Sequence, residues 1–269
     1  GGLLEVSGYL NNTPHTIGEW TAVGGTITLA APEVVAQRGA IFNISGGSVT
    51  YQSGFLRQTY VLGIDGRIYN INTAPSNLGY ITVVNGFVVR HNQGGKLDTT
   101  LTETYASILG FGGSIWQDGY TVGRDAGQLI LSTPTSVFEG QIVADVIRGI
   151  QQANTRPANV SDGYKLTQNT TPLAGALALG RYNGSGLAGA YTTDVKFGSV
   201  ASITNGLTAT GALPSDRANT AYFDAPVLNG YGLGGLNIGT GNSISVNAPL
   251  NFAPGAQVKL TAPVVDIAA

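Results

Sequence analysis

A short cassette occurs four times in this chain of 269 residues, and every copy ends in proline. Each copy has two apolar residues two positions apart, with proline three positions after the second. The copies span 25–32 (GTITLAAP), 127–134 (GQLILSTP), 242–249 (NSISVNAP) and 256–263 (AQVKLTAP). Alternation at period two predicts a half-buried strand. Proline has no N–H for a sheet ladder, so it predicts the corner at which the strand ends.

The spacing between related strands predicts how the cassettes assemble. Ile27 and Leu29 are echoed by Val49 and Tyr51, 22 residues later. A second pair of echoes, also 22 residues apart, links 236–238 to 258–260. A fixed period of about 20–50 residues is typical of repeat proteins. Because the period holds strands and no helical pattern, we predict a parallel β-helix in which Ile27 stacks on Val49 and Leu29 on Tyr51.

Composition excludes several classes of protein. The chain has 40 glycines and only 10% charged residues, a mixture that disfavours a helical fold; residues 100–109 are the best helix candidate, and a weak one. The net charge of −2 comes with no basic stripe, so no nucleic-acid partner is expected. The absence of cysteine removes disulfides and thiolate sites, and no cofactor or metal is expected. No apolar run approaches the length of a membrane span.

The start of the chain predicts that it belongs to something longer. It begins Gly-Gly, contains no methionine and shows no signal peptide. We therefore expect an internal piece of a longer polypeptide.

The 22-residue register is lost between residues 60 and 119. Two hairpin signals lie there instead: Asp65-Gly66 between two alternating runs, and Asn85-Gly86 between 80–84 and 87–89. Such dipeptides favour the tight turns that match strand twist. We predict β-helix coils over 1–59, an inserted antiparallel hairpin subdomain over 60–119, and continuing coils over 120–269.

Several stretches resemble large exoproteins of the filamentous haemagglutinin family. They are LNNTP at 10–14, GTITLAAPEVV at 25–35, ISGGSVTY at 44–51, DGR at 65–67, GYTVGRDAG at 119–127 and LAGALALG at 173–180. The resemblance covers residues 1–180 and is to a downstream domain of unassigned function. It implies a right-handed parallel β-helix, export by a two-partner outer-membrane transporter, and a place outside a Gram-negative cell, secreted or at its surface. The family's secretion domain is not in this segment, and no catalytic residue is carried over.

Two carboxylates and two histidines are the candidates for chemistry. Asp118 precedes the stretch 119–127 and Asp125 lies within it; the two could act as an acid/base pair or a calcium site, as in β-helical polysaccharide-cleaving enzymes. The structural alternative, which we favour, is that Arg124 and Asp125 pair with backbone or each other where the insertion rejoins the coil. His15 and His91 are expected in exposed loops, and no nucleophile motif accompanies either.

Aromatic residues crowd the predicted insertion. The possible partner-binding residues are Tyr80, Phe87, Tyr105, Phe111 and Trp116. Exposed rings can stack on sugars or anchor an interface. Alternatively, these rings form the small core that a two-hairpin insertion needs in order to persist.

The expected function is that of a non-enzymatic segment of a surface exoprotein, a stiff stalk that mediates attachment. Its expected partners are a surface glycan or protein and the transporter during secretion. One alternative is a β-helical carbohydrate-active enzyme. Another is a filament subunit that associates end to end or through hairpin edges.

Overall fold

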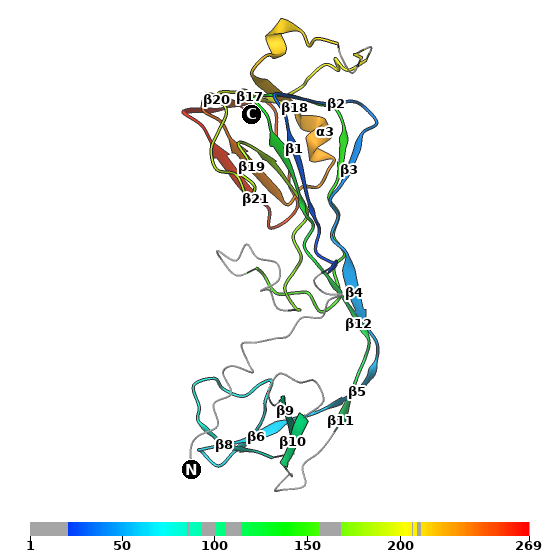
Figure 1. The fold of residues 1–269 in the computed structure, drawn as a ribbon, viewed down its shortest axis with the longest axis vertical. Helices are drawn as coiled ribbons and strands as arrows, with labels where there is room; N and C mark the ends of the chain where they lie inside the picture. The colour runs from blue at the N-terminus through cyan, green and yellow to red at the C-terminus, as the bar shows by residue number, and fades with distance from the viewer. Residues whose placement is uncertain are drawn as a thin grey trace. The chain divides into compact units, whose positions relative to one another are not determined.

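The computed structural model describes residues 21–84, 87–92, 100–105, 114–156, 168–205, 207–208 and 211–268. Strands dominate this part of the chain, and parallel sheets hold the majority of them, so the predicted all-β class is confirmed (Figure 1). The chain divides into two compact units. Unit 1 contains Tyr51–Gly119, and unit 2 contains the described residues before Tyr51 and from Tyr120 onward.

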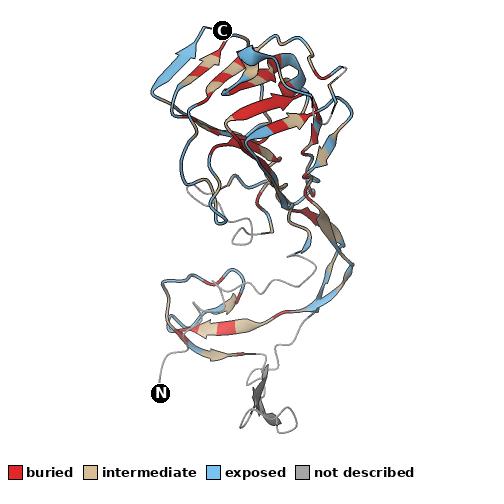
Figure 2. Cartoon of the chain, turned by 45° about the horizontal axis from the view of Figure 1, so that its top comes forward, coloured by how far each residue is buried: buried red, intermediate tan, exposed pale blue. Residues whose placement is uncertain are grey.

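Unit 2 is built on a parallel sheet of five strands, here called sheet I. In spatial order they are β1 (Thr26–Ala30), β13 (Gln128–Ser132), β16 (Ala176–Leu179), β19 (Gly235–Gly239) and β21 (Gln257–Thr261). Alternate residues point to opposite faces of a strand, so residues in register form apolar rows. One row consists of Ile27, Leu129, Leu177, Leu236 and Val258. Figure 2 shows the buried strands of this unit stacked side by side.

A second parallel sheet, sheet II, has six strands. In spatial order they are β2 (Glu33–Ala36), β14 (Thr135–Phe138), β18 (Thr220–Asp224), β17 (Asp194–Gly198), β20 (Ser243–Val246) and β22 (Val264–Ile267). Its inner face carries an aromatic stack in which the rings of Phe197 and Phe223 lie 5.2 Å apart. The inner rows of sheets I and II meet in one hydrophobic core.

The proline cassettes form the corners between the two sheets. β1 leads through Pro32 into β2, β13 through Pro134 into β14, and β21 through Pro263 into β22. These three strand–corner–strand units are as predicted. The fourth is not, because β20 ends at Val246, before Pro249, and a loop rather than a strand follows.

The predicted stacking of Ile27 on Val49 and Leu29 on Tyr51 is wrong. Ile27 pairs with Leu129, and Leu29 with Leu131, whereas β4 (Ser48–Tyr51) pairs with β12 (Tyr120–Gly123). The chain leaves unit 2 after β4 and returns at β12, so the next strand of sheet I is 102 residues on from β1. The 22-residue register holds only at the other end, where β19 lies beside β21.

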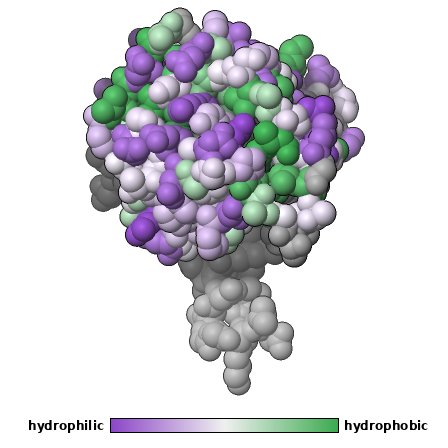
Figure 3. Space-filling model, turned by 90° about the horizontal axis from the view of Figure 1, so that it is seen from above, coloured by the Kyte–Doolittle hydropathy of each residue, from purple (hydrophilic) through white to green (hydrophobic). Residues whose placement is uncertain are grey.

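Sheet II contains one strand more than sheet I because β18 is intercalated. β16 leads to β17, but the chain then loops over 199–219, through a 3-10 turn at Ser215–Arg217, and re-enters the sheet between β14 and β17. A short helix, α3 (Ala225–Asn229), follows directly. The described strands therefore stack in parallel layers without closing into a continuous solenoid. Seen from above in Figure 3, the surface is mostly hydrophilic with separate apolar patches.

A parallel sheet of two strands pairs β3 (Ile41–Asn43) with β15 (Gln141–Val143). β3 follows β2 along the chain, and β15 follows β14. Ile44 and Ile142 from this region join the core of unit 2. No helix in the described residues is both long and apolar enough to cross a membrane.

Unit 1 contains antiparallel pairs. β6 (Tyr60–Gly63) lies between β7 (Ile68–Asn70) and β8 (Tyr80–Val83). The Asp65-Gly66 hairpin joins β6 to β7 as predicted, and Gly66 has the positive φ of 77° that such a turn requires. The predicted Asn85-Gly86 hairpin is wrong in its pairing, because β8 pairs with β6 and not with the strand that follows it.

Two further antiparallel pairs complete the described part of unit 1. β9 (Phe87–Asn92) pairs with β10 (Thr100–Tyr105), and β5 (Gly54–Arg57) pairs with β11 (Ser114–Gln117). The weak helix prediction for 100–109 is wrong over 100–105, which form a strand; 106–109 lie outside the described residues. Pairing with the preceding strand β9 overrides the helical preference of this segment.

Candidate functional site

Tyr80 is a core residue of unit 1, which corrects its placement among exposed partner-binding residues. It is 1% exposed, and its hydroxyl donates to the carbonyl of Pro75 (2.6 Å). Its ring meets Tyr69 edge-on at 6.2 Å between centroids. Burial raises the pKa of the Tyr80 phenol, and the charge of Asp65 adds to the effect. For this residue the core alternative is the one observed.

The structure brings Phe87 and Tyr105 together but says less about Phe111. Phe87 and Tyr105 are directly paired positions of β9 and β10. Phe111 lies outside the described residues.

Trp116 of β11 forms an exposed aromatic pair with Phe55 of the neighbouring strand β5. Its side chain is 54% exposed, and its ring meets that of Phe55, which is 70% exposed, edge-on at 5.0 Å. The indole N–H donates to the Asp118 carboxylate (2.8 Å). The hydrogen bond and the ring contact both restrict the indole, so an apolar ring is held in a fixed orientation in the open.

Both faces of the β5–β11 ribbon are apolar. Phe55 opposes Trp116 on one face, and Leu56 opposes Ile115 on the other. Leu56 is 52% exposed and Ile115 is 50% exposed. An isolated two-stranded ribbon buries too little area to be stable on its own, so exposed apolar side chains on both faces favour a bound partner. Phe55 was missed in the sequence analysis, although the run Gly54-Phe-Leu-Arg57 signals it.

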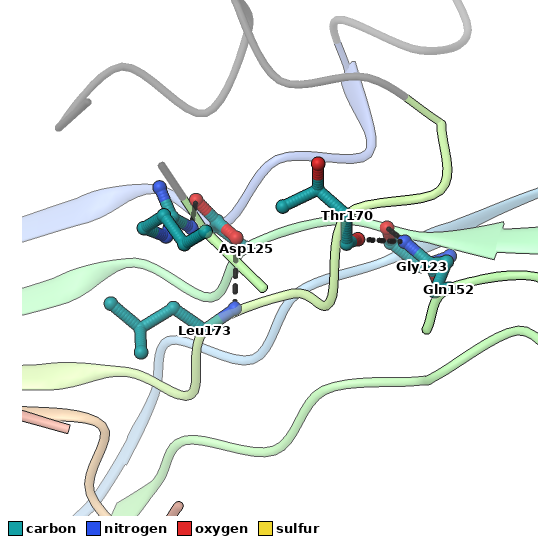
Figure 4. A network of polar contacts seen from close by, with 6 residues as sticks. Gly123, Asp125, Gln152, Thr170 and Leu173 are labelled. Carbon is teal, nitrogen blue, oxygen red and sulfur yellow. Dashed lines mark hydrogen bonds and ion pairs between the residues drawn. The ribbon is translucent and has the colours of Figure 1, made fainter. Parts of the chain in front are cut away.

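Asp125 is used as a structural clamp in unit 2. Its carboxylate accepts the backbone N–H of Leu173 (2.8 Å) and forms an ion pair with Arg156, as Figure 4 shows for the Leu173 contact. Asp118, by contrast, belongs to unit 1 and holds Trp116. The carboxylates proposed as an acid/base pair thus lie in different units, each with a partner of its own. The pairing predicted for Asp125 is observed with backbone and with Arg156 rather than with Arg124.

Gln152 organises the same region through hydrogen bonds to backbone groups. It is 2% exposed. Its amide oxygen accepts the N–H groups of Gly123 and Gly149 (both 2.8 Å). Its amide nitrogen donates to the carbonyls of Gly123 and Thr170 (both 2.9 Å), two residues that lie beside it in Figure 4. A primary amide has two donors and a two-lone-pair acceptor, so this side chain is fully satisfied. Its polarity signals a loop, and only tertiary contacts reveal that it is buried.

Of the two histidines, the structure describes only His91. His91 lies in β9 rather than in an exposed loop, and His15 lies outside the described residues. Within the ranges that the structure describes, no group of three or more histidine, cysteine, aspartate or glutamate side chains could hold a metal ion.

Comparisons with known proteins return nothing for this chain. No family model matches it, no curated protein matches it, and no solved structure matches it. The candidate site therefore depends on the geometry of the exposed Phe55–Trp116 pair alone.

Proposed function

We propose that this chain is a non-catalytic, extracellular attachment segment of a large surface exoprotein. In this proposal unit 2 is part of a stalk, and unit 1 presents the contact surface. The observation that carries it is the exposed Phe55–Trp116 pair, with its indole oriented by Asp118. Flat apolar rings beside a carboxylate suit the C–H faces and hydroxyls of a sugar, so the proposed partner is a surface glycan.

The stalk part of the proposal is supported by the stacked parallel strands of unit 2. Every layer buries apolar side chains on the next, which stabilises an elongating stack through nearest-neighbour contacts. We propose that these layers follow the path of a right-handed parallel β-helix, because crossovers between parallel strands are right-handed in nearly all proteins. Export through an outer-membrane transporter belongs to the same proposal and depends on the family resemblance.

A glycan array probed with the whole chain tests the attachment role. Trp116→Ala and Phe55→Ala should each abolish the strongest signals, whereas Ile150→Ala, which removes another exposed apolar side chain (94% exposed), should leave them intact. Trp116→Phe keeps a ring but loses the N–H bonded to Asp118, and should retain part of the signal. Binding that survives deletion of residues 60–119 together with Phe55→Ala would place the contact elsewhere.

A filament subunit is a second candidate, favoured by the edge strands of unit 2. β21 and β22 end their sheets, and Val258, Val264 and Ile267 on them are 49%, 59% and 63% exposed. An apolar sheet edge invites pairing with another chain. Concentration-dependent fibres under the electron microscope would support this function, and a monomer at all concentrations would exclude it. The enzyme alternative predicts new reducing ends from acidic polysaccharides that are lost in Asp125→Ala.

A further inference from the structure

We propose that a groove in unit 2, over β14, β18 and α3, binds a small ring-sized organic acid through its carboxylate. The groove has a volume of about 480 Å³, within the range of roughly 300–1,000 Å³ of small-molecule sites. All of its lining residues belong to unit 2, so the site is independent of the Phe55–Trp116 surface.

The intercalated strand β18 creates this groove. Along β18, Ala221 and Phe223 point into the core, so Tyr222 and Asp224 point outward. Outward-facing Val137 of β14 lies in register with Tyr222. The loop that brings the chain back to β18 supplies one wall, and α3 with Tyr231 supplies another. The polar side chains of the groove therefore lie close together because the chain returns after β17 to insert β18 beside β14.

Arg217 gives the groove a cation that is only weakly neutralised. Its side chain is 13% exposed, and its guanidinium carbon lies 4.5 Å from the centroid of the Tyr222 ring. Its one ion pair in the described chain is with Asp216, 3.8 Å away, whose side chain is 75% exposed. Long pairs with an exposed carboxylate offset little charge. Stacking on Tyr222 holds the planar guanidinium of Arg217 in place, and a guanidinium held in this way favours a carboxylate as its ligand.

A second guanidinium lines the same groove. Arg38 is exposed, and the described residues provide no ion pair for it. The charges of Arg38 and Arg217 balance those of Glu139 and Asp224 in the same lining, and each guanidinium can donate several hydrogen bonds to a bound anion. An acid bound between the two guanidinium groups would gain charge-assisted hydrogen bonds from both sides.

The carboxylates that line the groove are already used to build its walls. Glu139 accepts hydrogen bonds from the hydroxyl groups of Ser202 and Thr204 (both 2.5 Å) and from the backbone N–H of Ile203 (2.6 Å). Asp224 accepts the backbone N–H of Val227 (3.3 Å) at the start of α3 and that of Val200 (3.4 Å). Their acceptor capacity is directed at the protein, which leaves the arginines to a ligand.

The rest of the groove suits an apolar or ring-shaped body. The buried, outward-facing side chain of Val137 forms the floor, and Val227 lies at the rim with 49% exposure. The Tyr231 hydroxyl donates to the carbonyl of Gly140 (2.5 Å). Burial, with the charge of Asp224 adding to it, raises the pKa of Tyr231 to about 12, so this wall remains an uncharged phenol. A carboxylate attached to one ring fits a surface of this kind.

The test uses pairs of probes that differ only in charge. The whole chain is titrated, by NMR or calorimetry, with benzoate against benzamide and with glucuronate against glucose. We expect benzoate or glucuronate to bind at least about tenfold more tightly than its uncharged counterpart. Which acid binds better distinguishes an aromatic acid from an acidic sugar. Equal binding of charged and uncharged probes, or no binding of either acid, would overturn the proposal.

Variants locate the site. Arg217→Gln and Arg38→Gln should each weaken binding of the acid by about tenfold or more. Arg181→Gln is the matched control, because Arg181 also stacks on a tyrosine in unit 2 (4.9 Å from the Tyr191 centroid) but lies outside the groove. If Arg217→Gln does not fold, Arg217→Lys replaces it in the binding measurement, because lysine keeps the charge but lacks the planar guanidinium. Unchanged affinity in the folded Arg38 and Arg217 variants, or an equal loss in Arg181→Gln, would contradict the assignment.

Discussion

Ile27 lies directly beside Leu129 in adjacent parallel strands, although almost the whole of unit 1 separates them along the chain. The residue at the apparent repeat distance, Val49, belongs instead to a two-stranded pairing of β4 with β12. The core of unit 2 therefore combines strands from before and after the segment of the chain that forms unit 1. Closing such a loop costs conformational entropy that grows only slowly with its length, so the excursion is thermodynamically tolerable.

A double-mutant cycle tests this pairing. Ile27→Val and Leu129→Ala should be non-additive by about 0.5 kcal/mol or more, because residues in contact share the packing that either change removes. Ile27→Val with Val49→Ala should be additive within about 0.5 kcal/mol. The measurement is the free energy of unfolding in urea. Coupling of Ile27 to Val49 and not to Leu129 would restore the 22-residue register.

Two glycines at equivalent cassette positions should respond differently to alanine. A Cβ on Gly127 would lie 1.7 Å from the carbonyl oxygen of Gly25, whereas a Cβ on Gly25 would meet nothing within 4 Å. Gly127→Ala should therefore cost about 2 kcal/mol or more of unfolding free energy, since backbone must move. Gly25→Ala should change it by no more than about 0.5 kcal/mol. Equal effects in thermal or urea unfolding would contradict the close approach of the two strands.

The sequence was sufficient where a single residue dictates backbone geometry. Pro32, Pro134 and Pro263 end their strands at the predicted corners, and Asp65-Gly66 forms the predicted hairpin. In each case the cause is local: a missing N–H, or a turn that needs positive φ. The same reasoning correctly gave an all-β protein with parallel strands.

The sequence did not allow us to predict contacts between segments that are distant along the chain. β8 has the turn dipeptide Asn85-Gly86 after it, yet it pairs with β6 because Tyr80 then packs into the small core of unit 1. Gln152 has the composition of a loop, yet it is buried where Gly123, Gly149 and Thr170 present backbone groups to it. Neither choice leaves a pattern in the local sequence.

Replacing Ser136 by alanine should stabilise the protein. Ser136 is 1% exposed on the inner face of sheet II, and among the residues that the structure describes its hydroxyl has no hydrogen-bond partner. Ser136→Ala should raise the unfolding free energy by about 1 kcal/mol, because the desolvation cost of the hydroxyl disappears.

Ser132 is the matched control for Ser136. It is also buried, at 3% exposure, but its hydroxyl accepts the backbone N–H of Tyr182 (3.1 Å). Ser132→Ala should lower the unfolding free energy by about 1 kcal/mol. A loss of stability in Ser136→Ala as large as that in Ser132→Ala, measured by urea unfolding, would mean that Ser136 has a partner in solution.

The Glu139 carboxylate should make unit 2 sensitive to acid. Burial by itself would raise the pKa of Glu139, but the hydrogen bonds from Ser202, Thr204 and the Ile203 backbone outweigh it and hold the pKa below its ordinary value of 4.5. A group with a lowered folded-state pKa adds stability that is fully present above its unfolded pKa and is lost as pH falls through the folded value. Stability should therefore decline below about pH 4.5.

Two glutamine variants separate this effect from general acid unfolding. Glu139→Gln should be less stable than the parent at neutral pH and should lose less on acidification, since it has no carboxylate to protonate. Glu33→Gln changes an exposed glutamate at the start of β2 that accepts no side-chain hydrogen bond from the described residues, and should keep the parent's response to acid. The measurement is urea unfolding at pH 7 and at pH 3. A parental acid response in Glu139→Gln would show that the 202–204 loop is not held by this carboxylate.

Because Glu139 also builds a wall of the arginine groove, acid should loosen this wall of the groove in the parent.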